Sequence, residues 1–334
     1  MKINKTIFIL LITMFLAIQA FGQTKQQRKN IIKDYDLKTL NALSQQLERA
    51  YEREKRAAFE YARQHNLPLV VENEDGHKSY LYRMDRFGNL NYITTSGKAD
   101  AQTIGTNKLY PGGGLGLALE GEGMKIGIWD AGPVRTTHEL LSGKTVQKDQ
   151  GHGESPDHAT HVAGIAAGKQ LDSGFGANAR GMAYKADIDA YDWNNDFSEM
   201  STAASEGLLV SNHSYGLDLS QVPNVGSYLG AYDDISMTAD NLTYYAPYYT
   251  VVTAAGNDRN GGYNPSQGGY NLLGGWMTTA KNTIVVAAVD KVLMYMGPSS
   301  VHMSNFSSWG PTNNNRVKPD ISAQGVDVLS STAA

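Results

Sequence analysis

Two side chains in the middle of the sequence have the types and the spacing needed for acid–base chemistry. Asp130 ends the apolar run 125–129, and His158 follows 28 residues later, in a stretch whose small residues suit a tightly packed helix. A carboxylate at a strand end can fix the tautomer of a facing histidine and stabilise the imidazolium that forms when the ring takes up a proton. The pair is therefore predicted to be the base and its orienting group in a hydrolytic triad.

Simpler interpretations exist for the same residues. Asp130 alone could be a loop carboxylate, and His158 and His161 could be core histidines. His152, His158 and His161 with Asp157 could instead bind the metal of a hydrolase, although their spacing matches no standard zinc signature. The chain has no cysteine, which excludes a cysteine nucleophile, thiolate zinc sites and disulfides.

A repeated order of apolar runs and helix-like stretches indicates how these residues are positioned. Each run ends at or near a polar residue, and the runs span 124–129, 188–191, 208–210, 249–255 and 284–289. Helices are expected at about 157–168, 198–207 and 228–246. Strands that alternate with helices imply a mostly parallel sheet covered on both faces, with the site at the carboxyl ends of the strands.

The first hundred residues have a different character. Residues 1–22 combine Lys2 and Lys5 with a short apolar run and small residues near Gly22, as in a secretory signal, so export is expected. Apolar residues spaced by three, four and seven from Leu37 to His65 predict a long helix, and short β-like runs follow it. We therefore divide the chain into a signal at 1–22, an α+β N-terminal region at 23–104 and a larger domain at 105–334.

Several motifs around these residues resemble those of the subtilisin-like serine proteases. Asp130 lies in Ile-Trp-Asp-Ala-Gly and His158 lies in His-Ala-Thr-His-Val-Ala-Gly, which are similar to the family's first two signatures. The similarity covers roughly residues 105–334. Further matches follow in the family's order at 181–183, 212–216, 254–257, 307–311 and 318–321.

The resemblance implies a subtilisin-like three-layer α/β fold, with a mostly parallel central sheet and helices on both faces, and a serine endopeptidase activity. It implies that Asn257 donates its amide to the oxyanion of the tetrahedral intermediate, although alone it could be a turn asparagine. It also implies that the backbone of Ser214, Tyr215 and Gly216 pairs with an extended peptide. Residues 23–104 resemble a propeptide that is cleaved between about 95 and 110 and inhibits the mature enzyme; a permanent N-terminal domain is the alternative.

Three departures from the family pattern bear on activity. Ala131 and Ala159 replace a hydroxyl residue and a glycine, and both changes are small. The third is larger, because the nucleophile motif Gly-Thr-Ser-Met-Ala does not occur, and Ser330 and Ser331 lack the glycine that precedes the family's serine. We expect the nucleophile to lie beyond residue 334 and the fragment to be inactive; the alternative is a catalytically inactive peptide-binding pseudoprotease.

Cofactors and partners follow from the same features. Serine chemistry requires no cofactor, and a structural calcium ion is possible although no site can be assigned. The net charge of −4 argues against nucleic acid. No second apolar run is long enough to span a membrane, so no membrane is expected as a partner after signal cleavage. The expected partners are peptide or protein substrates and the chain's own N-terminal propeptide.

Overall fold

The computed structural model describes residues 24–72, 78–95, 101–151, 155–172, 179–292, 294–326 and 328–333. The expected signal segment and His152 lie outside these ranges. The α-helices are α2 (Lys25–Ile31), α3 (Leu37–Gln64), α4 (Pro156–Ala167), α5 (Asp196–Ser205) and α6 (Asp234–Tyr245).

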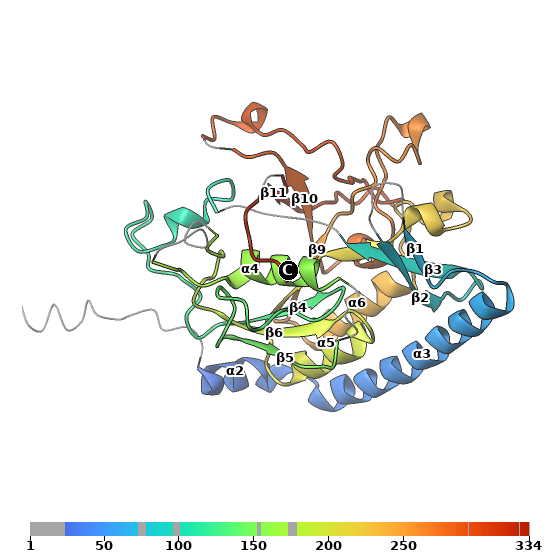
Figure 1. Cartoon of the computed structure of the whole chain (residues 1–334), viewed down its shortest axis with the longest axis horizontal. Coiled ribbons are helices and arrows are strands. Elements are labelled where there is room, and N and C mark those ends of the chain that lie inside the picture. Colours follow the sequence, from blue (N-terminus) through green and yellow to red (C-terminus); the bar gives the residue numbers. More distant parts are fainter. Residues whose placement is uncertain are drawn as a thin grey trace, which may run out of the picture.

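A seven-stranded sheet forms the centre of the larger domain (Figure 1). All neighbouring strands in it run parallel, in the order β11-β10-β9-β7-β4-β6-β5. The mostly parallel α/β architecture expected from the alternating pattern is therefore confirmed. The strands are β4 (Lys125–Asp130), β5 (Thr145–Gln147), β6 (Asp187–Asp192), β7 (Val210–His213), β9 (Thr250–Ala254), β10 (Ile284–Val289) and β11 (Ile321–Gln324).

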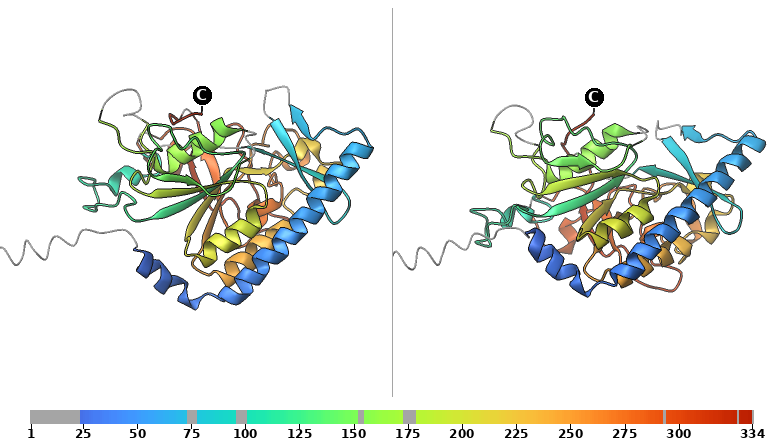
Figure 2. Two further views of the ribbon diagram at one scale, coloured as in Figure 1. Left: turned by 60° about the horizontal axis from the view of Figure 1, so that its bottom comes forward. Right: turned by 90° about the horizontal axis from the view of Figure 1, so that it is seen from below.

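Successive residues of the central strands enter two different cores, because side chains alternate across a sheet. Ile128 and Ala190 pack with the small residues of α4, whereas Trp129 and Tyr191 pack with α5 and α6. Figure 2 shows α4 on one side of the sheet and α5 and α6 on the other. The apolar strand runs in the sequence thus reflect burial on both faces.

The N-terminal region lies on the α5 and α6 side and shares its core. The long helix α3 packs along α5, with Leu40 fully buried, and the Ser44 hydroxyl bonds with Ser198 and Thr202 of α5. Three strands of this region, β1 (Val70–Glu72), β2 (Lys78–Met84) and β3 (Leu90–Thr95), form an antiparallel sheet with β8 (Tyr215–Leu217) of the larger domain. The two regions are therefore joined by a common core and a common sheet.

Element boundaries differ from the expected ones by a few residues. Strand β7, which corresponds to the apolar run at 208–210, begins at Val210 rather than at residue 208, since its pairing with β9 starts at Val210 opposite Thr250. Helix α6 begins at Asp234 rather than near 228, because the Asp233 carboxylate caps it by accepting from the Ser236 amide.

Candidate active site

The structure brings Asp130 and His158 into direct contact. Asp130 is the last residue of β4, which lies between β6 and β7, and His158 lies in the first turn of α4. The His158 Nδ1 atom is 2.6 Å from Asp130 Oδ1, and the Asp130 side chain is fully buried whereas His158 is 19% exposed. Because a carboxylate accepts hydrogen bonds, this contact places the imidazole proton on Nδ1.

The opposite edge of the imidazole is free to act as a base. His158 Nε2 is buried and has no hydrogen-bond partner within the described ranges. With the proton on Nδ1, Nε2 carries the lone pair, so it can accept a proton from a hydroxyl placed against it. Among the described residues Asp130 Oδ2 is also buried without a partner, while Oδ1 accepts a second bond from the Ala131 amide at 2.8 Å. Ala131 stands where the family has a hydroxyl residue, so its side chain offers no donor to Oδ2.

Asn257 lies in the loop that follows β9, and a segment fifty residues later holds that loop. The Ser308 amide donates to the Gly256 carbonyl at 2.8 Å, and the Ser308 hydroxyl accepts from the Asp258 amide at 2.9 Å. Gly256 has φ +100°, a conformation that favours glycine. Asn257 itself is exposed, so its amide is accessible to a bound substrate.

A carboxyl group beside Asn257 titrates close to neutral pH. Burial raises the pKa of Asp258 to about 7, although the Ser308 hydroxyl donates to Asp258 Oδ2 at 3.3 Å and opposes the rise. The loop that carries the expected oxyanion donor therefore changes charge near pH 7.

Tyr215 and Gly216 lie in β8 and Ser214 directly precedes it, but another part of the chain covers one edge of β8. Strand β3 pairs antiparallel with β8, with Thr95 opposite Tyr215 and Thr94 opposite Gly216. The Asp218 amide extends this pairing by donating to the Tyr92 carbonyl at 2.8 Å. One edge of the backbone at Tyr215 and Gly216, which is expected to pair with a peptide, is thus occupied by the N-terminal region.

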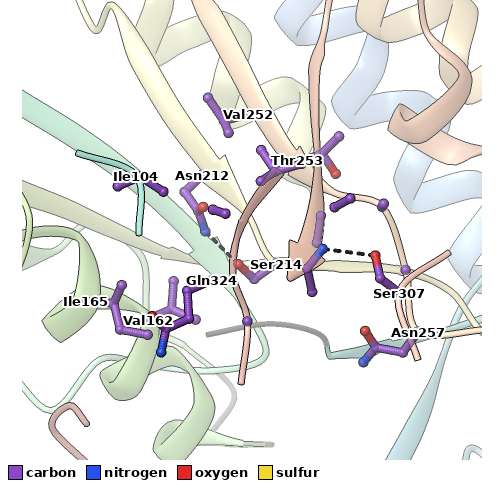
Figure 3. Close-up of a pocket in the computed structure, with 18 of the residues that line it drawn as sticks. Ile104, Val162, Ile165, Asn212, Ser214, Val252, Thr253, Asn257, Ser307 and Gln324 are labelled. Atoms are coloured by element: carbon purple, nitrogen blue, oxygen red, sulfur yellow. Dashed lines mark hydrogen bonds between the residues drawn. The ribbon is translucent and has the colours of Figure 1, made fainter. Parts of the chain in front are cut away.

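A cavity of about 340 Å³ lies at the carboxyl ends of the strands, and its lining includes Ser214 and Asn257 but neither Asp130 nor His158. Ser214 lies in the middle of its lining, with Asn257 toward one end and Ile104, Ile165 and Val162 toward the other (Figure 3). Val162 lies one helical turn after His158 on α4. Most of the lining is apolar; six of its residues belong to β9 and β10 and three to α4, so the cavity is bordered by the central sheet and by α4.

The last described residues pass along α4 without approaching His158 Nε2 with a hydroxyl. Ser330 Oγ donates to the His161 carbonyl and Ser331 Oγ to the Thr160 carbonyl, each at 2.8 Å. The tail approaches so closely that a Cβ on Gly164 would lie within 2.4 Å of both hydroxyl oxygens. Both hydroxyls therefore donate to the backbone of α4.

Two buried residues at this site, Asp196 and Tyr82, were missed in the sequence, and so was their connection to Tyr215. Asp196 begins α5 and accepts hydrogen bonds from the hydroxyl groups of Tyr82 and Tyr215, each at 2.7 Å. No pattern in the sequence pairs these residues, which come from three separate elements. Ser308 was noted only as part of a motif, without its role in holding the Asn257 loop.

A metal site is not visible in the described ranges. They contain no group of three or more histidine, aspartate and glutamate side chains placed to hold a metal ion. His152, which the metal-hydrolase alternative needs, lies outside them, and the possible calcium ion stays a prediction. Within these ranges no helix is both long and apolar enough to cross a bilayer.

In the comparison with protein families, the subtilase family matches residues 121–334, which is more than half of the chain. Among curated proteins, a serine protease/ABC transporter B family protein, tagD, of Dictyostelium discoideum is 26% identical over 71% of this chain. The C5a peptidase of Streptococcus pyogenes serotype M3 is 48% identical over 16% of this chain. The chain spans only 14% and 4% of the lengths of these two relatives.

Two solved structures are similar at low identity. MycP1 with its N-terminal propeptide removed has a TM-score of 0.40 and 17% identity, covering 64% of this chain and 67% of that one. MycP3, a protease from the type VII (ESX-3) secretion system, has a TM-score of 0.37 and 20% identity, covering 71% of this chain and 69% of that one.

Proposed function

Because the chain belongs to the subtilase family, we propose that it is part of a secreted serine endopeptidase whose triad includes Asp130 and His158. The observation that carries this proposal is the 2.6 Å contact between Asp130 and His158, with Nε2 of the same ring left without a partner in the described part of the chain. A pseudoprotease that only binds peptides would need neither group.

The chain's residues would divide the work as follows. His158 Nε2 takes the proton from a serine hydroxyl as it attacks the peptide carbonyl, and later returns it to the leaving amine. Asp130 keeps the ring in the required tautomer and stabilises the imidazolium. Asn257 donates its amide to the oxyanion that develops on the carbonyl oxygen. None of these steps requires a metal or an organic cofactor.

We propose that the serine comes from a chain segment outside these 334 residues. Support comes from the apolar cavity beside the central sheet, which a helix following the serine could fill, and from His158 Nε2, which has no hydrogen-bond partner in the described part of the chain. The decisive experiment treats the longer gene product with a serine-reactive phosphonate. Covalent labelling and loss of peptide hydrolysis would support the endopeptidase, whereas binding of peptides without hydrolysis or labelling would support the pseudoprotease.

Replacing Asn257 by alanine tests the oxyanion assignment. The change should lower kcat by roughly 10²–10³-fold and leave KM nearly unchanged, because the amide acts on charge that exists only in the transition state. Asn260→Ala, in the same loop and also exposed, serves as the matched control. An N257A variant that loses affinity for substrate but keeps kcat would contradict the assignment.

The N-terminal region would then act as an inhibitor that is removed during maturation. Its strand β3 pairs with one edge of β8, the strand that the resemblance assigns to the substrate, so a peptide and β3 would compete for that edge. Its core is shared with the larger domain, which also suits a permanent domain. Whether and where the chain is cleaved decides between a removable inhibitor and a permanent domain.

We expect the mature protein to begin between Thr95 and Thr103. Thr95 is the last residue of β3, and the Thr103 hydroxyl is bonded to Gln324 of the larger domain at 2.8 Å, so the two ends belong to different regions. Mass spectrometry of the exported protein gives its N-terminus, and the His158→Ala form should remain uncut if the cleavage is its own. A mature N-terminus at Gln23 would show that the region is permanent.

A further inference from the structure

The fully buried carboxyl group of Asp196 is shared between the N-terminal region and the strand β8. Its Oδ1 accepts from the Tyr82 hydroxyl of β2 and from the Phe197 amide at 2.8 Å. Its Oδ2 accepts from the Tyr215 hydroxyl of β8. The carboxyl group is thus a joint between two segments that belong to different regions of the protein.

Tyr215 connects this joint to the strand that β3 covers. Its backbone lies opposite Thr95, while its side chain is 1% exposed and lies within 3.0 Å of His213 Nδ1. The ring of His213 stacks on Trp129, the residue before Asp130. The Tyr215 hydroxyl is therefore held by Asp196 and His213. Through Tyr215 these two residues position the backbone of β8.

On the other side of the joint, Tyr82 belongs to the docked region. Its ring packs against Tyr51 of α3 and Trp276 of the larger domain, with centroid distances of 5.3 Å and 5.1 Å. The next residue, Arg83, bonds to Glu54 of α3 and to Asp234 at the start of α6. Undocking of the region would remove Tyr82 and Arg83 together and open Asp196 to water.

We propose that Asp196 is a positioning residue for the substrate strand, acting through Tyr215, and that docking of the N-terminal region on the same carboxyl group takes up a proton. The inference rests on the proposed function, since it treats β8 as the substrate strand and the N-terminal region as its inhibitor. It adds that the pH controls docking of the N-terminal region through one buried acid, Asp196.

The groups that face Asp196 explain why a proton is held there. Burial raises the pKa of Asp196 to about 6, against the opposing hydrogen bonds from Tyr82 and Tyr215 and the charge of Arg83. Within α5 itself, burial and neighbouring carboxylates raise the pKa of Glu199 to about 9, so Glu199 stays neutral over the same range. Burial lowers the pKa of His213 to about 3, so this histidine is neutral as well.

The sign of the pH effect follows from the two states of Asp196. In the docked state its pKa is about 6, and in the undocked state water brings it toward the ordinary value of about 3.9. A group with the higher pKa in the docked state favours docking when protonated, so docking is strongest below about pH 4 and weakens as the pH rises through 6. The difference of about two units sets an upper limit of about 100-fold on this weakening.

Hydrogen exchange of the 334-residue chain measures docking without requiring activity. The probes are peptides that contain β3 and the segment 215–218, followed from about pH 4.5 to 7.5 and corrected for the intrinsic exchange rate. We expect protection of both peptides to fall as the pH rises. In Asp196→Asn, a neutral residue of the same shape, protection should keep its acidic value at every pH.

Two further variants remain informative if Asp196→Asn does not fold. Tyr82→Phe and Tyr215→Phe each remove a hydrogen bond that lowers the pKa of Asp196, so each should shift the midpoint of the protection curve to higher pH. Ser44→Ala, which loosens the contact between α3 and α5 without touching a titrating group, should lower protection equally at every pH.

The wild-type pH profile retained in Asp196→Asn, or unmoved midpoints in both tyrosine variants, would overturn the inference. These results are independent of catalysis, because no nucleophile takes part in the measurement. Failure of the phosphonate experiment would overturn the proposed activity and leave the exchange results in place.

Discussion

Replacing His158 by alanine, or Asp130 by asparagine, is expected to lower kcat on the order of 10⁴-fold in the longer protein that carries the nucleophile. His158→Ala removes the base that takes the serine proton. Asp130→Asn keeps the shape of the side chain, but its amide can donate to Nδ1, and the ring then carries its proton on Nε2, where it cannot act as a base. Peptide hydrolysis under saturating substrate gives kcat for each variant.

The control for this prediction is His302→Ala, which removes an exposed histidine far along the chain from the pair. That variant should keep its activity. Circular dichroism and the melting temperature should show that the His158 and Asp130 variants remain folded, since neither change removes apolar core volume. A kcat close to the wild-type value in either variant would show that Asp130 and His158 do not act as the orienting group and the base.

The central sheet could be predicted because its information is local. This holds for five of its seven strands: each is a short apolar run that ends at or near a polar residue, such as the run that ends at Asp130, and the helices between the runs favour a parallel arrangement. The edge strands β5 and β11 are short and partly exposed, and no apolar run predicted them. The alternation of Ile128 and Trp129 between two cores follows from strand geometry alone. The start of α6 could not be placed as well, since it depends on a cap that several polar residues in that stretch could have supplied.

The contact between Asp130 and His158 was also within reach of the sequence, because a strand end and a helix start meet at the same edge of a parallel sheet. The pairing of β3 with β8 was not. The two strands are more than a hundred residues apart, and β3 has no residue pattern that selects one exposed strand edge over another. The same holds for Tyr82 and Asp196, which are 114 residues apart and meet only because α3 and β2 dock on α5.

The 334-residue chain by itself is expected to be inactive on peptides and to resist labelling by a serine-reactive phosphonate. Labelling needs a hydroxyl activated by His158 Nε2, and this atom has no partner within the described ranges. Ser330 and Ser331, the serines that pass near α4, donate to backbone carbonyls instead. Measurable labelling, located by mass spectrometry, would reveal a nucleophile among these residues and contradict the expectation.

The apolar cavity gives the same expectation a second, physical readout. Its lining includes Val162, Ile165, Val252, Val286 and Phe306, and each large side chain left without its packing partner costs about 2–5 kcal/mol. Domains are stable by only about 5–15 kcal/mol, so a cavity of this kind removes much of that margin. We therefore expect residues 105–334 expressed alone to aggregate or to bind a hydrophobic dye strongly, and a longer form containing the nucleophile segment to lose that binding. A monomeric 105–334 fragment that melts in one sharp transition without binding dye would contradict this, and would favour a peptide-binding domain that needs no further segment over the central sheet.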